Sequence, residues 1–253
     1  MRDSMRALAA IGLLSMACPV AARAQAPAGS PPPPPPPALS GNVSAGLGMT
    51  SGNTDTTSFN GSYEVKFDPK TRNVLKSNGL FLYGKSNGTL STEQYGLLVR
   101  DEYSFGARAF AFGEVRYLHD RFKGISYLLS PTFGAGYKVV DEKNTSLSVS
   151  AGVGSVSERD YGFATRTTGA VSFEEKLTYK LSSSAAVGQS VSALWHIGDF
   201  GNGLYLVGVN LTSTLVGRAQ LKVEALDSYR TRPPLPTLKR NDVALLMGII
   251  FKF

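Results

Sequence analysis

Apolar and polar side chains alternate with a period of two along most of the chain beyond residue 40. One of the clearest runs places Val171, Phe173, Leu177, Tyr179 and Leu181 on one side and Arg166, Thr168, Ser172, Glu174, Lys176, Thr178 and Lys180 on the other. Such alternation is typical of a β-strand with one apolar and one polar face. No helical period of useful length occurs in this region. We therefore expect an all-β protein.

Turn residues divide this region into about twelve strands. The breaks contain pairs such as Asp68-Pro69, Asn87-Gly88 and Lys123-Gly124, which favour turns. The strands are expected at 41–50, 56–67, 74–84, 92–105, 108–119, 126–140, 145–156, 165–181, 185–197, 203–216, 218–229 and 241–253. Most are longer than the five or six residues usual in globular proteins, and about nine to eleven tilted residues cross a bilayer.

The apolar faces point either into a soluble core or outward to lipid, and two observations favour lipid. The polar faces are rich in Gly, Ser, Asn and Thr with spaced charges, which is typical of a barrel lumen. Tyrosine and phenylalanine, 24 in all, gather near strand ends, as aromatic girdles do. The pattern predicts a transmembrane up-and-down antiparallel β-barrel. Two misfits, Asp101 and Glu175, fall in the apolar phase, and either an interfacial position or a β-bulge accounts for them.

The last strand has the most specific pattern. Its apolar residues all share one phase: Val243, Leu245, Met247, Ile249, Phe251 and Phe253. This resembles the final strand of Gram-negative outer-membrane barrels, where a terminal phenylalanine is read by the barrel-assembly machinery. We expect this strand to close the barrel, because an open apolar edge promotes aggregation.

The first 24 residues have the three parts of a secretory signal peptide. Arg2 and Arg6 are followed by an uncharged apolar run, and Ala22-Arg23-Ala24 fits a cleavage site. Lipidation at Cys18 is the less favoured alternative. Residues 25–40 form a proline-rich periplasmic linker, a spacer or a docking segment, and residues 41–253 form the barrel. We expect export to the outer membrane, with lipid and lipopolysaccharide as surroundings.

The composition leaves little material for enzyme chemistry. One cysteine and two histidines exclude a disulfide scaffold and a cysteine zinc site, and no cofactor, metal or nucleic-acid motif is present. An outer-membrane phospholipase needs a serine two positions after its histidine, but Arg121 follows His119 and Gly198 follows His196. His119 and Asp120 point to opposite faces of a regular strand. We expect no catalytic residues, and an outer-membrane hydrolase remains the minor alternative.

Three segments carry a family resemblance. Residues 41–56, including Ser51-Gly52-Asn53-Thr54-Asp55, the Asp120-Arg121-Phe122 segment, and the ending from Lys239-Arg240-Asn241-Asp242 to Phe253 resemble the salt-induced outer-membrane protein family that includes YdiY. The family's function is unknown. The resemblance implies an outer-membrane barrel over residues 39–253 and a link to salt stress, and it supplies no catalytic residues.

The polar phase predicts the lining of the lumen. The charged members are Glu64, Lys66, Arg100, Glu102, Glu114, Arg116, Lys138, Arg166, Glu174, Lys176, Lys180, Lys222 and Glu224. Basic residues outnumber acidic ones, so we expect a narrow, weakly anion-selective channel for small solutes. The alternative is a closed structural or envelope-stress barrel that binds a partner through its outer loops. The basic loop 230–240 binds anionic lipopolysaccharide or is simply solvated.

Overall fold

The computed structural model describes residues 38–50, 56–121 and 123–253. The predicted signal peptide and its cleavage site, and nearly all of the proline-rich linker, lie outside the described residues. So do the Ser51–Asp55 turn and Phe122, both of which contributed to the family resemblance. Among the described residues there is no helix that is long and apolar enough to cross a membrane.

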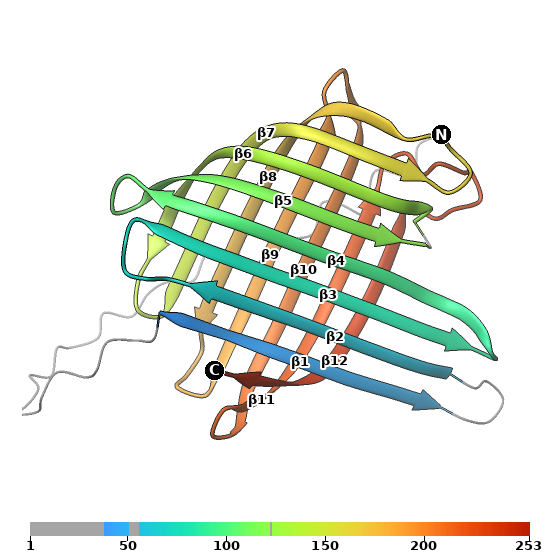
Figure 1. Ribbon diagram of the computed structural model, residues 1–253. Helices are drawn as coiled ribbons and strands as arrows, with labels where there is room; N and C mark the ends of the chain where they lie inside the picture. The colour runs from blue at the N-terminus through green and yellow to red at the C-terminus, as the bar shows by residue number, and fades with distance from the viewer. Residues whose placement is uncertain (1–37, 51–55, 122) are drawn as a thin grey trace, which may run out of the picture. The chain divides into compact units, whose positions relative to one another are not determined.

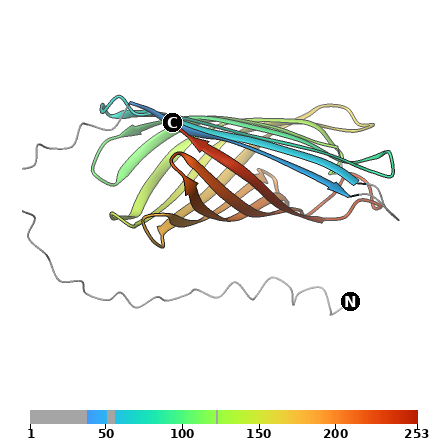
Figure 2. The same cartoon turned by 90° about the horizontal axis from the view of Figure 1, so that it is seen from below.

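Twelve antiparallel strands form one closed barrel, in which each strand pairs with its neighbour in sequence and β1 pairs with β12 (Figures 1 and 2). Their bounds are β1 Leu39–Thr50, β2 Thr56–Phe67, β3 Asn73–Ser86, β4 Thr89–Ser104, β5 Ala109–Asp120, β6 Ile125–Asp141, β7 Thr145–Asp160, β8 Arg166–Lys180, β9 Ala185–His196, β10 Asp199–Val216, β11 Ala219–Arg230 and β12 Asn241–Lys252. The predicted fold class is therefore confirmed. Leu39 and Phe253 lie at what we call the base end, and the opposite end is the loop end.

Two connections at the loop end are shorter than the sequence indicates. β3 and β4 continue to Ser86 and Thr89, so only Asn87 and Gly88 form the turn, with φ of 49° and 76°. Asn-Gly tolerates positive φ at both positions, as a two-residue hairpin turn requires. β9 and β10 likewise leave only Ile197 and Gly198 between them, with φ of 90° at Gly198. β7 extends to Asp160 and carries two acidic residues into the sheet.

The outer surface of the barrel is apolar along most strands. Large apolar side chains are strongly exposed there, for example Leu47 at 77%, Phe133 at 66% and Leu245 at 76%. Water-soluble proteins rarely expose apolar side chains over a whole sheet. Aromatic rings near the loop end contact one another from strand to strand, as in the stack of Tyr95 on His119 at 5.0 Å between ring centres. This surface fits a bilayer with an interfacial aromatic belt.

The two charged misfits of the apolar phase lie on this outer surface without distorting the sheet. The pairing register is continuous through Asp101 and through Glu175, so the β-bulge alternative is wrong. Asp101 accepts a hydrogen bond from Asn73 Nδ2 at 3.0 Å, near the base end of β3. Glu175 accepts one from Gln189 Nε2 at 3.4 Å. Each carboxylate therefore has a polar partner.

The seam between β1 and β12 has the shortest register. Four residue pairs join these strands, from Asn42 with Lys252 to Ala45 with Ile249, whereas twelve pairs join β1 to β2. Beyond them, Gly41 and Phe253 exchange two backbone hydrogen bonds of 3.1 Å each. Phe253 thus contributes a large share of the bonds that close the barrel.

We predict that deleting Phe253 lowers the fraction of folded barrel in the outer membrane several-fold. The deletion removes two of the few backbone bonds at the seam together with the final aromatic ring. The measurement is the fraction of protein in the outer-membrane pellet that shows a heat-modifiable shift on a gel. Phe105→Ala, which removes another exposed phenylalanine ring, from a turn, is the control. Equal folded fractions for the deletion and the control contradict the prediction.

Candidate functional site

A cavity of about 710 Å³ runs inside the barrel. Its lining includes Asn42 and Lys252 near the base end and Asp120 and Asp242 at the loop end. Residues from both ends of the barrel therefore face one continuous space. This space is the candidate functional site.

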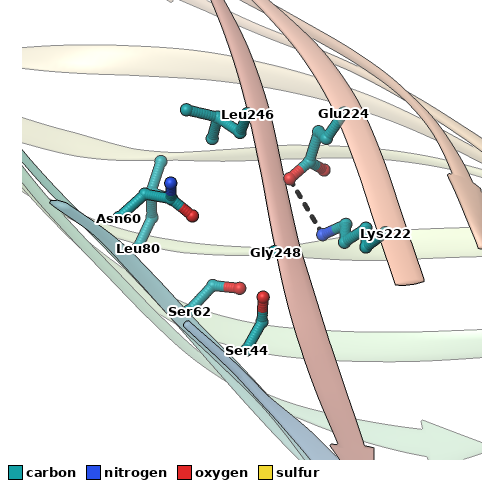
Figure 3. A pocket seen from close by; sticks show the side chains of 8 residues that line it. All are labelled: Ser44, Asn60, Ser62, Leu80, Lys222, Glu224, Leu246 and Gly248. Atoms are coloured by element: carbon teal, nitrogen blue, oxygen red, sulfur yellow. Dashed lines mark ion pairs between the residues drawn. The ribbon is translucent and has the colours of Figure 1, made fainter. Parts of the chain in front are cut away.

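A small recess of the lumen lies beside the β1–β12 seam (Figure 3). Ser44, Ser62 and Asn60 line one side of it, and the ion pair between Lys222 and Glu224, 2.8 Å long, lines the other. Gly248 of β12 separates the two sides in the figure. A Cβ atom at Gly248 would lie 2.8 Å from the backbone oxygen of Ala45, so glycine permits the close approach of β12 to β1.

The base half of the lumen contains a charged network that we call the base zone. Arg100 is its centre: the guanidinium donates to Glu102 at 3.0 Å, Glu114 at 2.9 Å, Glu174 at 2.7 Å and Ser150 at 3.1 Å. It also lies 3.8 Å from the ring centre of Phe112. These residues come from β4, β5, β7 and β8, so the network reaches across the barrel interior. Its charges are buried but paired, as stability requires.

A second charged cluster, the loop zone, lies at the opposite end. Glu158 accepts hydrogen bonds from Arg166 and from Arg230, the latter at 3.3 Å, and Arg230 also donates to Asp160 at 2.8 Å. Lys123 is only 1% exposed, and its Nζ lies 2.8 Å from the backbone oxygen of Arg240 and 2.9 Å from Asp242. Sequence reasoning missed this cluster because it assigned residues 157–164 and 230–240 to loops.

Between the two zones an apolar layer lines the lumen from β3 to β12, whereas β1 and β2 contribute polar side chains such as Asn60 and Ser62. We define it by the inward aliphatic residues Leu80, Leu82, Leu98, Leu118, Leu128, Val156, Ala170, Leu194, Leu204, Leu206, Leu226, Ala244 and Leu246. On the β5–β10 side, seven residues that include Ile125 form a buried cluster that occupies this side of the interior. On the other side Leu80, Leu82, Leu98, Leu206 and Leu226 line the cavity. The layer was not predicted, although Leu80 and Leu82 share the phase of Lys76 and Asn78.

The predicted lumen residues are divided among four places. Glu64, Arg116, Glu174, Lys176, Lys222 and Glu224 line the cavity, and Arg100, Glu102 and Glu114 lie in the buried network. Arg166 belongs to the loop zone, while Lys66, Lys138 and Lys180 lie near the base rim. At that rim Lys66 hydrogen-bonds to Asp68 and, with Lys70, lowers the pKa of Asp68 to about 2, so this turn carries an ionised carboxylate. Lys76, which binds Glu102 at 2.6 Å, was missed.

The residues of the C-terminal pattern all face outward. Val243, Leu245, Met247, Ile249, Phe251 and Phe253 are between 43% and 76% exposed. They therefore form one apolar stripe along β12, on the surface that meets lipid.

The two histidines lie on different faces of the barrel. His119 faces outward, with Nδ1 2.7 Å from the backbone oxygen of Ser126. His196 faces inward, where Nδ1 is 2.8 Å from Thr168 Oγ1 and Nε2 is 3.6 Å from Glu158. Glu158 already accepts hydrogen bonds from Arg166 and Arg230, so His196 and Glu158 belong to the ion-pair cluster of the loop zone. Within the residues that the structure describes, no group of three or more His, Cys, Asp or Glu is placed to hold a metal.

Comparisons with known proteins agree with the barrel fold. The family model described as "Protein of unknown function, DUF481" matches residues 43–253. The NanC porin superposes with a TM-score of 0.51 at 9% identity, over 85% of this chain and 100% of that one. The KdgM porin gives a TM-score of 0.45 at 9% identity, over 85% of this chain and 99% of that one. A comparison with curated protein sequences found no match. At 9% identity the likeness to the NanC porin shows the fold alone.

We predict that Arg100→Ala destabilises the barrel by about 3 kcal/mol or more, because it leaves buried carboxylates without their cation. The measurement is the free energy of unfolding from urea titrations in lipid vesicles. Arg232→Ala is the matched control: its pair with Asp199 is exposed, and we expect a change of at most about 1 kcal/mol. Equal effects of the two substitutions contradict the role of the network.

Proposed function

The chain belongs to the DUF481 family of proteins of unknown function, and we propose that it is a Gram-negative outer-membrane barrel with a narrow passage for small, preferentially anionic solutes. The signal peptide over residues 1–24 and the linker over residues 25–40 belong to this proposal, because export delivers the chain to the assembly machinery. The salt-stress link and the YdiY-like assignment rest on sequence resemblance and stay predictions.

The continuous cavity carries the proposal. Spread over the apolar band of roughly 25 Å that is usual for such barrels, a volume of about 710 Å³ corresponds to a mean cross-section of about 28 Å². A passage of this size admits small solutes and excludes large ones. Twelve strands leave an interior between the filled eight-stranded barrel and the open porin.

The charge of the cavity near its base supports a preference for anions. Lys222 is paired with Glu224, whereas Lys176 and Lys252 form no ion pair within the described part of the chain. The carboxylate of Glu64 interacts electrostatically with all three lysines. In this part of the cavity the three lysines face Glu64 and Glu224. A third carboxylate there, Glu174, is already paired with Arg100 at 2.7 Å. This balance of charge favours anions electrostatically.

The buried part of the apolar layer favours the second candidate, a closed barrel that binds a partner at its loop end. The cluster of Leu118, Leu128 and Leu194 fills one side of the lumen. The basic loop at that end is less available than its sequence indicates, because Arg230 is buried in the loop zone and Arg232 binds Asp199 at 2.6 Å. Lipopolysaccharide binding would therefore depend on Lys239 and Arg240.

We predict small single-channel conductance with weak anion preference in planar bilayers with asymmetric KCl. Lys176→Glu should shift the reversal potential towards cations, because it places a negative charge in the cavity. Lys143→Glu makes the same charge change in an exposed turn at the base end and should shift the potential much less. Absence of conductance steps from heat-modifiable protein contradicts the passage and favours the closed barrel.

A further inference from the structure

The apolar layer is unusual for a passage that carries only hydrated ions. Lumen-facing positions of outer-membrane barrels are normally polar because water fills the interior. Here Leu80, Leu98, Leu206 and Leu226 line the cavity and are only partly buried by protein. Their remaining apolar surface faces the cavity itself. Removing such surface from water is favourable, so the layer offers a binding surface for an aliphatic group.

The same cavity places cations at a defined distance from this surface. Strand β11 contributes Lys222 and, four residues further towards the loop end, Leu226, both of which line the cavity. Four residues of extended strand span roughly 14 Å. Lys176 of β8 and Lys252 of β12 also line the cavity near the base end, as Lys222 does. An elongated molecule with an anionic head and an aliphatic tail would match both regions at once.

The cavity also has the size expected of a small-molecule site. Ligand pockets usually enclose roughly 300–1,000 Å³, and the volume of about 710 Å³ lies within that range. Most of its lining residues are polar, so the leucines form a distinct apolar patch within it. A hydrated inorganic ion would use the lysines but leave the leucines in contact with water. A neutral hydrocarbon would use the leucines and supply no anion to Lys176 and Lys252, which form no ion pair within the described part of the chain.

We propose that the lumen binds a single-chain anionic amphiphile of the fatty-acid class. The acyl chain lies along Leu80, Leu206 and Leu226, and the carboxylate lies between Lys176 and Lys252, next to the Lys222–Glu224 pair. The proposal rests on the proposed function in that it names the solute class of the same cavity, but binding does not require transport.

Binding is measured with radiolabelled dodecanoate on the barrel in lipid nanodiscs, with empty nanodiscs as the background. We expect saturable binding that strengthens from butyrate to octanoate to dodecanoate in competition, with dodecanol competing at least tenfold more weakly than dodecanoate. Lys176→Glu and Leu226→Asn should each weaken dodecanoate binding about tenfold. The controls are Lys143→Glu and Leu235→Asn, which make the same changes in an exposed turn and in the 231–240 loop. The chain-length series on the unmodified protein keeps the test valid if Leu226→Asn fails to fold.

The outcomes separate this inference from the passage. Conductance without dodecanoate binding above empty nanodiscs overturns the inference and leaves the passage intact. Binding without conductance supports the site and contradicts the passage. Binding that is equal for dodecanoate and dodecanol, or unchanged in both variants, reflects partition into lipid and overturns the inference. Stronger competition by a two-chain anionic phospholipid than by dodecanoate also overturns it, because the site would then recognise a membrane lipid.

Discussion

Closure of the sheet by the pairing of β1 with β12 is the contact on which the rest of the structure depends. Inside a bilayer no water is available for unpaired backbone groups, so a sheet is stable there only when every strand has two neighbours. The register from Asn42 with Lys252 to Ala45 with Ile249 supplies the last neighbour, and the bonds between Gly41 and Phe253 complete it. Glycine at position 248 allows the two strands to come this close.

Once the sheet closes, its alternation divides the side chains between lipid and lumen. The lumen is then organised along its length into the base zone, the apolar layer and the loop zone. Most charges in the two zones are paired across strands that are distant in sequence, as Arg100 of β4 is with Glu174 of β8 at 2.7 Å. The leucines between the zones separate them with a section of low polarity. A solute that passes through or binds in the lumen must therefore contact both charged and apolar side chains.

The sequence was sufficient for the strands and for the phase of their faces, because lipid outside and polar groups inside produce alternation that is visible residue by residue. It was not sufficient for the apolar layer. Residue type does not distinguish an inward leucine such as Leu82 from a lipid-facing one such as Leu245. In the second half of β3, residues on both faces of the strand are apolar, so alternation does not show which face is inward. The loop zone was missed for a different reason: Glu158 and Arg230 meet through tertiary closure, and their sequence neighbours resemble loops. The sequence identified Asn87-Gly88 as a turn. It did not show that β3 and β4 continue up to this turn, because that depends on the pairing of Ser86 with Thr89.

Cysteine scanning along β11 tests most directly the claim that a closed barrel encloses two charged zones separated by an apolar layer. Cys18, the only cysteine of the chain, lies in the predicted signal peptide, so each introduced thiol is unique. The account predicts that fluorophores at Val223→Cys and Ala225→Cys are quenched by nitroxide lipids. Thiols at Lys222→Cys and Glu224→Cys should instead react with a water-soluble reagent, and the thiol at Leu226→Cys should react markedly more slowly. Lipid quenching at positions 222 and 224, or equal reactivity at 222, 224 and 226, would contradict the account.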